Sequence, residues 1–164
     1  YKAEKINTHG GSLRIYVKKN LKTKIDKSVK SLLSEEEKFG IKKYETYQNF
    51  AKKVYKIRES VRKNILKLKE NGTKIIGYGS PAKATTALNF FGISNEIECI
   101  VEDNKLKQGK LLPGVKIPIV SKSDIKDKPD FALVLAWNFI NEIKSKNVDL
   151  AHKFISIKDL EKKD

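Results

Sequence analysis

The chain has 164 residues, of which 39 % are hydrophobic and 34 % charged, a composition typical of a globular domain with a strongly charged surface. No run of roughly 18 apolar residues occurs, so the sequence predicts no membrane span. Its one cysteine, Cys99, excludes an internal disulfide and a cysteine-rich metal site, and we interpret it as a core thiol of a cytoplasmic protein.

The formal net charge of +15 favours an anionic partner such as nucleic acid. The charge is uneven, because residues 1–72 carry 20 basic and 8 acidic side chains whereas residues 73–164 carry 15 and 12. Only three of the 35 basic residues are arginine, the side chain that reads phosphates and bases most specifically. We interpret the lysine excess as solvated helix surface and expect no nucleic-acid partner, with a basic nucleic-acid-binding protein as an alternative.

Residues 12–19 (SLRIYVKK) alternate apolar and polar side chains, which predicts a strand with one buried face. The buried face would consist of Leu13, Ile15 and Val17. His9 lies just before this strand in THGGS, next to two glycines that indicate a turn. It is either a ligand contact or a structural side chain.

Two helices are predicted next. Residues 25–40 form a short helix that Asp26 caps and Gly40 ends. Residues 41–71 form a long amphipathic helix with one apolar stripe, which we expect to pack on the segment that follows. The stripe comprises Tyr47, Phe50, Ala51, Val54, Ile57, Val61, Ile65 and Leu68.

From residue 73 onward strand-like and helix-like patterns alternate, which is typical of an α/β fold. Strands are expected at 74–79, 97–103, 117–120, 130–137 and 153–157, with helices at 81–92 and 138–147. Pro118 indicates that the third of these strands is either at a sheet edge or irregular. The sequence thus predicts a Rossmann-like open parallel sheet of four to five strands with flanking helices. A boundary after residue 40 would separate an N-terminal segment (1–40) from the long helix and this sheet (41–164).

The first candidate site is Gly77-Tyr78-Gly79-Ser80-Pro81-Ala82, which fits G-x-G-x-x-A between a strand and a helix. Gly77 allows a tight turn, Gly79 lets a phosphate approach the backbone, and Ala82 lets helix and strand pack closely. Pro81 removes one N–H donor from this turn, and the Ser80 hydroxyl and Lys83 would compensate. The alternative is a plain strand-to-helix turn that contacts no ligand.

Two further strand ends carry polar side chains. Glu102-Asp103-Asn104 follows the second strand, and Asp103 lies 24 residues after Gly79, near the position of the ribose-binding acid of dinucleotide sites. An ordinary solvated turn has the same composition. Trp137 and Asn138 follow the apolar strand, where Asn138 is either a ligand contact or a helix cap and Trp137 either a ligand contact or a core residue.

The sequence contains no Walker loop, nucleophile elbow or pair of catalytic carboxylates. Its two histidines, His9 and His152, have no spacing to cysteine or carboxylate residues that indicates a metal site. We therefore name no catalytic residue and no metal ligand in this chain.

Four stretches, THGGSLRIYV, GYGSPAKATTALNFFGI, VEDNKLKQGKLLPGVKIPI and LVLAWNF, together resemble the C-terminal part of the sugar-nucleotide C-methyltransferase family. Enzymes of this family use S-adenosylmethionine to methylate a carbon of a deoxysugar linked to a nucleoside diphosphate. The resemblance implies that residues 9–14 are similar to the closing strand of the methyltransferase domain, so that residues 1–40 would be the tail of that preceding domain. The remainder is similar to the Rossmann-like C-terminal domain, which helps to form the sugar-nucleotide site.

The resemblance also implies a division of labour. The family's methyl-donor loop, zinc cysteines and acid–base residues all lie upstream of the matching region, and none is in this sequence. We therefore expect S-adenosylmethionine to serve the parent protein and not to bind this chain, and we expect the chain alone to be inactive. The partners implied are a nucleotide-diphosphate sugar and the upstream domain. An NAD- or CoA-binding module, or a scaffold that binds nothing, are the alternatives.

The same resemblance indicates which residues form the substrate-side surface. They are residues 77–83, residues 102–104, Pro113 and Gly114, and residues 136–138, with His9 as a further candidate.

Overall fold

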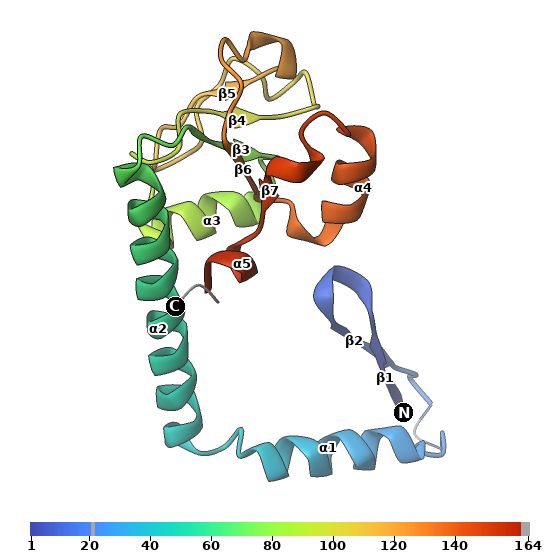
Figure 1. Cartoon of the computed structure of the whole chain (residues 1–164). Coiled ribbons are helices and arrows are strands. Elements are labelled where there is room, and N and C mark those ends of the chain that lie inside the picture. Colours follow the sequence, from blue (N-terminus) through green and yellow to red (C-terminus); the bar gives the residue numbers. More distant parts are fainter. Residues whose placement is uncertain (21, 162–164) are drawn as a thin grey trace. The chain divides into compact units, whose positions relative to one another are not determined.

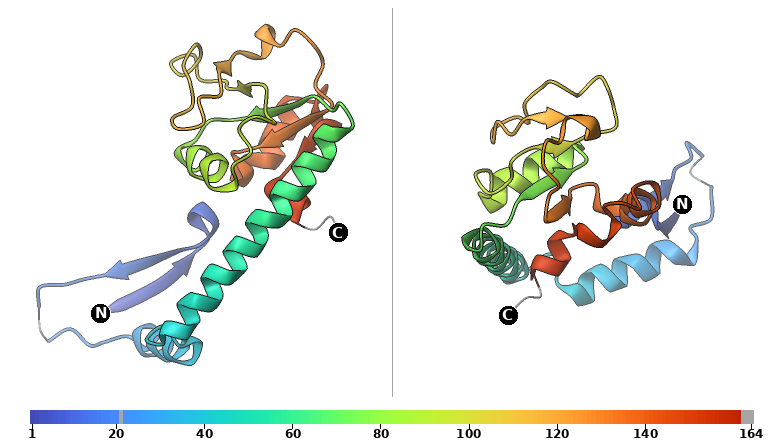
Figure 2. Two further views of the ribbon diagram at one scale, coloured as in Figure 1. Left: turned by 90° about the vertical axis from the view of Figure 1, so that its left-hand side faces the viewer. Right: turned by 45° about the horizontal axis from the view of Figure 1, so that its top comes forward.

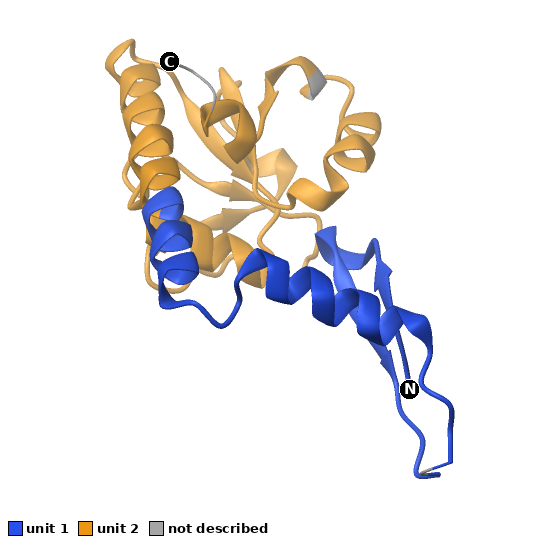
Figure 3. Ribbon diagram, turned by 90° about the horizontal axis from the view of Figure 1, so that it is seen from below, with its two compact units in different colours: residues 1–54 blue, residues 55–164 orange. Residues whose placement is uncertain are grey.

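The structure, a computed structural model, describes residues 1–20 and 22–161. The chain forms two compact units, Tyr1–Val54 and Tyr55–Asp164 (Figure 3), and the division falls inside helix α2 (Tyr44–Glu70). The boundary expected after residue 40 falls at the turn between α2 and the preceding helix α1 (Lys27–Phe39).

The first unit contains a hairpin and the helix α1. Strands β1 (Lys2–Ile6) and β2 (Ser12–Tyr16) pair antiparallel, and a 3-10 turn, η1 (Thr8–Gly10), joins them. The predicted ends of α1 are confirmed. The Asp26 side chain accepts a hydrogen bond of 2.8 Å from the Ser28 amide, and Gly40 ends the helix with a φ of 82°.

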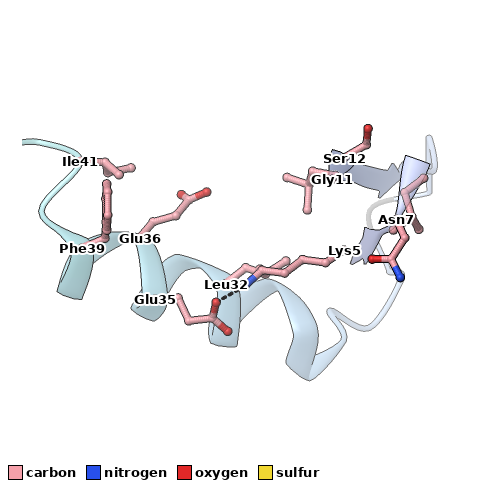
Figure 4. A pocket seen from close by; sticks show the side chains of 11 residues that line it. Lys5, Asn7, Gly11, Ser12, Leu32, Glu35, Glu36, Phe39 and Ile41 are labelled. Carbon is pink, nitrogen blue, oxygen red and sulfur yellow. Dashed lines mark hydrogen bonds and ion pairs between the residues drawn. The ribbon is translucent and has the colours of Figure 1, made fainter. Parts of the chain in front are cut away.

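The buried face predicted for β2 is wrong. Leu13, Ile15 and Val17 are exposed, the last of them by 84 %. The physical reason is that the described hairpin has only two strands and that α1 contacts β1. Between the hairpin and α1 lies an open groove of about 650 Å³, and Leu13 lines it (Figure 4). Apolar alternation thus identifies a face, but it does not tell whether another element covers that face.

The long helix is confirmed as α2, but its apolar stripe is covered over only part of its length. Val61 and Ile65 are fully buried, whereas Tyr47 and Phe50 are 55 % and 66 % exposed. The expectation that the whole stripe packs on the following segment is therefore wrong for its first half. Gly72 follows the helix with a φ of 72°, as predicted for a C-terminal cap.

The second unit is an α/β sandwich around one sheet (Figure 1). The described residues form five parallel strands in the order β5-β4-β3-β6-β7, which confirms the predicted Rossmann-like sheet. The strands are β3 (Ile75–Tyr78), β4 (Ile100–Val101), β5 (Ile119–Val120), β6 (Phe131–Val134) and β7 (Phe154–Ile155). The helices are α3 (Ala82–Phe91), α4 (Ile140–Lys146) and α5 (Ile157–Glu161), with 3-10 turns η2 (Lys122–Asp124), η3 (Trp137–Phe139) and η4 (Ala151–Lys153).

Helices cover both faces of this sheet (Figures 1 and 2). One core joins α2, α3 and α5 to the side chains of Ile75, Ile100 and Leu133. The opposite core joins α4 to the alternate strand residues, among them Ile76 and Val134. Apolar residues on both sides of each strand explain why the 131–137 segment reads as an uninterrupted apolar run.

The edge formed by β5 is covered by its own chain. The Ile119 amide donates to the carbonyl of Lys110, and the Ile119 carbonyl accepts from the amide of Gly109, both at 2.8 Å. The edge position predicted from Pro118 is thus confirmed. Several strands are shorter than expected: the strand predicted over 97–103 is formed only at Ile100–Val101, and β6 ends at Val134 rather than at 137. Strand β1 and helix α5 were not predicted at all.

Candidate functional site

The carboxyl ends of β3, β4 and β6 meet at one edge of the sheet. From β3 the chain passes through α3 to β4, which pairs with one side of β3, and β6 pairs with the other side of β3. The order of the strands along the chain therefore reverses between β3 and β6. Ligands of open α/β sheets bind in the crevice at such a point. Here the structure has a cavity of about 330 Å³, which we call the switch-point cavity. It is lined by Tyr78, Gly79, Ser80, Pro81, Glu102, Asp103, Lys107, Ala136, Phe139, Glu142, Ile143 and Lys146.

The two glycines of the predicted phosphate turn have roles within the fold itself. A Cβ added at Gly77 would lie 3.0 Å from side-chain atoms of both Ile100 and Leu135, so glycine permits close packing around β3. Gly79 has a φ of 82°, and a Cβ there would lie 2.9 Å from the Cβ of Ala136. Packing therefore accounts for Gly77, and packing together with a positive φ accounts for Gly79, whether or not a phosphate approaches.

The Glu102 carboxylate accepts hydrogen bonds from the glycine turn. Its Oε2 accepts from the Ser80 amide at 2.9 Å and from the Ser80 hydroxyl at 2.6 Å. Its Oε1 accepts from the Asn104 amide at 3.0 Å. The Lys107 ammonium lies 3.6 Å from Oε2 and donates to the Ser80 carbonyl at 2.9 Å. Four groups from three residues therefore converge on one carboxylate.

This network keeps Glu102 ionised. Only 13 % of its side chain is exposed, and burial by itself would raise the pKa of a carboxyl group. The hydrogen bonds from Ser80 and Asn104 and the charge of Lys107 outweigh the burial, so the pKa of Glu102 lies below its ordinary value of 4.5. The Gln108 side chain also donates to the Glu102 carbonyl at 2.7 Å, which fixes the backbone at this point.

Asp103, the predicted ribose-binding acid, faces the same cavity from the end of β4. It accepts a hydrogen bond of 3.1 Å from the Tyr78 hydroxyl and is otherwise exposed. Burial of the Tyr78 ring, and then the nearby charge of Asp103, raise the pKa of Tyr78 to about 12. Across the cavity, Lys146 pairs with Glu142 at 2.7 Å along α4.

Trp137 and Asn138 lie in η3, directly after β6, and neither lines the switch-point cavity. The Lys83 ammonium lies 4.4 Å from the centre of the Trp137 ring, a cation–π contact that links the start of α3 to the end of β6. Asn138 is exposed and caps no helix, so its interpretation as a cap is wrong. The structure leaves the ligand interpretation of both residues open to test.

Of the predicted site residues, seven line the cavity together, and these are Tyr78, Gly79, Ser80, Pro81, Glu102, Asp103 and Ala136. Asn104 contributes through its bond to Glu102. His9 belongs to the first unit, where it is exposed in η1 with a φ of 56°. Pro113 and Gly114 pack on α3 instead, since the Pro113 carbonyl accepts from the Asn89 amide group at 3.1 Å.

Sequence reasoning missed the contribution of α4 and of Lys107. Phe139, Glu142, Ile143 and Lys146 line the cavity from α4 and the turn before it. The spacing of Glu142 and Lys146, four residues apart, marks a paired helix face, but it does not indicate which side of the sheet the helix covers. Lys107 is one of many lysines, and its sequence neighbourhood holds no signal that sets it apart.

Residues 1–20 and 22–161 contain neither a metal-ligating cluster nor a membrane-spanning helix. No group of three or more His, Cys, Asp or Glu side chains is placed to hold a metal ion. No helix in this part of the chain is long and apolar enough to cross a membrane.

Comparison with known proteins identifies one family and one curated relative. Residues 7–156 match the family described as C-methyltransferase C-terminal domain. The chain is also 34 % identical over 140 residues to "C-methyltransferase NovU" from Streptomyces niveus. This alignment covers 84 % of the present chain and 33 % of the relative, so the chain spans about a third of that protein's length.

Proposed function

The chain belongs to the C-methyltransferase C-terminal domain family, and from this premise we propose that it binds and positions the substrate of a methyltransferase. The substrate class we propose is a deoxysugar linked to a nucleoside diphosphate, and the methyl donor of the parent protein is S-adenosylmethionine. The observation that carries the proposal is the switch-point cavity, because it lies where α/β sheets bind ligands and combines carboxylates, ammonium groups and an apolar wall.

We propose that S-adenosylmethionine binds elsewhere in the parent protein and not in this cavity. A Rossmann-type site would hold the donor through free amides in the glycine turn, but here the Ser80 amide is already bonded to Glu102. We therefore assign no step of methyl transfer to this chain. Its proposed contribution is orientation: contacts to remote parts of the substrate hold the reacting carbon in place, and this lowers the entropic barrier of the reaction.

Asp103 gives the sharpest test of this role. In the complete methyltransferase, Asp103→Asn is expected to raise KM for the sugar nucleotide about tenfold, the loss of one charged hydrogen bond, and to leave KM for the methyl donor unchanged. Asp127→Asn is the matched control, since Asp127 is an exposed carboxylate that pairs with Lys74 outside the cavity. An equal rise for both substrates, or no rise at all, would contradict the proposed role.

A second candidate, an NAD- or CoA-binding module, is favoured by one observation, the presence of Asp103 in the cavity 24 residues after Gly79. Calorimetric titration of the chain with NAD, coenzyme A, thymidine diphosphate and uridine diphosphate separates the candidates. Micromolar binding of NAD that Asp103→Asn abolishes would favour the dinucleotide module. Binding of a nucleoside diphosphate without binding of NAD supports the sugar-nucleotide role.

A further inference from the structure

The glycine turn after β3 has fewer free donors than its sequence pattern indicates. The Gly79 amide donates to the Val101 carbonyl at 2.8 Å, and the Ser80 amide donates to Glu102. Pro81 has no amide hydrogen, and the Ala84 amide donates to the Pro81 carbonyl at 2.8 Å. A phosphate approaching this turn would therefore meet no free backbone donor at Gly79, Ser80, Pro81 or Ala84.

The group that accepts the hydrogen bond of the Ser80 amide, the Glu102 carboxylate, is itself an anion. Glu102 receives two donors from Ser80, one from Asn104 and the nearby charge of Lys107, which is the set of contacts that a bound phosphate oxygen would make. With 13 % of its side chain exposed, it fills this position from inside the fold. A phosphate could take its place only by displacing an ionised carboxylate from these hydrogen bonds.

The rest of the cavity favours uncharged groups that donate hydrogen bonds. Asp103 and Glu142 add two further carboxylates, and Lys146, which lines the cavity from α4, is already paired with Glu142. Carboxylates repel phosphate and accept hydrogen bonds from hydroxyl groups. Phe139, which is 55 % exposed, adds an apolar surface at the same cavity.

We propose that Glu102 is a specificity-determining residue that occupies the anion position of the glycine turn. The turn thereby rejects phosphate, and the cavity contacts a hydroxyl-bearing part of the ligand, either the ribose or the deoxysugar. The second half of this inference rests on the proposed function, whereas the rejection of phosphate does not.

The test uses the chain with inorganic pyrophosphate at constant ionic strength, followed by amide NMR and thermal unfolding. In the wild type, the Ser80 and Asn104 amide resonances are expected to show no saturable shift. Glu102→Ala vacates the position and leaves its donors in place. It is expected to bind pyrophosphate at least about tenfold more tightly than wild type and to gain thermal stability with ligand concentration. Glu98→Ala, which removes an exposed carboxylate just before β4, is expected to behave as wild type.

Two results would overturn the inference. One is a saturable shift of the Ser80 amide in the wild type, and the other is a folded Glu102→Ala that gains no pyrophosphate binding. If Glu102→Ala does not fold, Glu102→Gln replaces it, because the amide keeps the shape and removes the charge. It is expected to gain pyrophosphate binding, and its failure to do so counts against the inference equally.

A parallel titration separates this inference from the proposed function. A nucleoside-diphosphate sugar is expected to shift the amides of Phe139 and Ile143 and to leave the Ser80 amide unchanged. If it shifts none of them, the sugar-nucleotide role fails while the pyrophosphate result still decides the role of Glu102. If it shifts Ser80 in a saturable way, the phosphate lies in the turn and the inference fails.

Discussion

Gly79 combines a φ of 82° with a close approach to Ala136, and these two features explain why the turn contains glycine without reference to a ligand. A G-x-G pattern in a sequence records only that side chains are absent. It does not tell whether a phosphate, a neighbouring strand or a turn of the backbone takes their place. At Gly77 and Gly79 the structure points to neighbouring residues of the fold.

Gly79→Ala is expected to destabilise the second unit by about 2–4 kcal/mol, because it adds left-handed strain and a contact too short for a Cβ. Gly109→Ala is the control, since Gly109 has a φ of 76° but no atom within 4 Å of an added Cβ. It is expected to cost only about 1 kcal/mol. Urea unfolding measures both, and equal losses would show that the contact with Ala136 contributes nothing.

The Tyr78 hydroxyl is expected to ionise with a pKa of about 12, against an ordinary value of 10.0. Because the pKa is raised in the folded state, the stability linked to this group is complete below pH 10.0 and is lost as the pH rises toward 12. Tyrosinate absorbance followed against pH measures the step. Tyr78→Phe should remove it, and an unchanged titration curve in that variant would contradict the assignment.

Glu102 gives the opposite pH dependence. Its pKa is lowered in the folded state, so its contribution to stability is present above pH 4.5 and is lost as the pH falls through the folded-state value. Glu102→Gln is expected to cost about 1–3 kcal/mol at neutral pH, the range for hydrogen bonds to a charged group. The difference from wild type in urea unfolding should shrink below pH 4.5. A difference that is constant with pH would exclude the charge as its cause.

At the scale of elements, α2 shows what an apolar periodicity can and cannot tell. The same three- and four-residue spacing runs through the helix, yet its side chains are buried at Val61 and Ile65 and exposed at Tyr47 and Phe50. Periodicity follows from the geometry of the helix alone, whereas burial depends on what another element brings to that face. The sequence therefore predicts the helix correctly, but it predicts only in part which of its apolar residues are buried.

Ile65→Ala is expected to destabilise the second unit by about 2–5 kcal/mol, because it leaves a cavity in a fully buried core. Leu66→Ala, at the next position and 39 % exposed, is expected to cost less than about 1 kcal/mol. Chemical unfolding of both variants measures the difference. Similar losses would contradict the assignment of this helix face to the core.

Elements with local end signals were predicted best. Asp26 and Gly40 define α1 through their own backbone and side chains, so no tertiary information is needed. The strands proved shorter than their apolar runs, because pairing requires a neighbour at the same height in the sheet. The five-residue α5 carries too little periodicity to detect, and its last carbonyls are satisfied from far away by Ser60 and Asn64 on α2.

For the whole molecule, the alternation of strands and helices after residue 73 was enough to predict a parallel sheet, and the reversal of strand order then places the cavity. The detailed chemistry of that cavity was not predictable. Glu102 reads as one of three polar residues in a turn, and nothing in the sequence indicates that its carboxylate returns to Ser80. The missing information is three-dimensional contact between residues 22 positions apart.

The family match and the length of the relative lead to a prediction about activity. The chain alone, given S-adenosylmethionine and a keto-sugar nucleotide, is expected to transfer no methyl group, because it spans about a third of the related C-methyltransferase. A radiolabelled methyl-transfer assay checks this, with the complete enzyme as the positive control. Turnover by the chain above the uncatalysed rate would contradict the division of labour proposed here.

The way the sheet ends also bears on how the protein behaves in concentrated solution. An open strand edge offers unpaired amides and carbonyls on which a second molecule can add a strand. Here both edge strands, β5 and β7, have two residues. The outward-facing amide and carbonyl of Ile119 are hydrogen-bonded to Lys110 and Gly109. The β5 edge therefore offers no template for cross-molecular pairing, and we expect the second unit to resist aggregation through this edge.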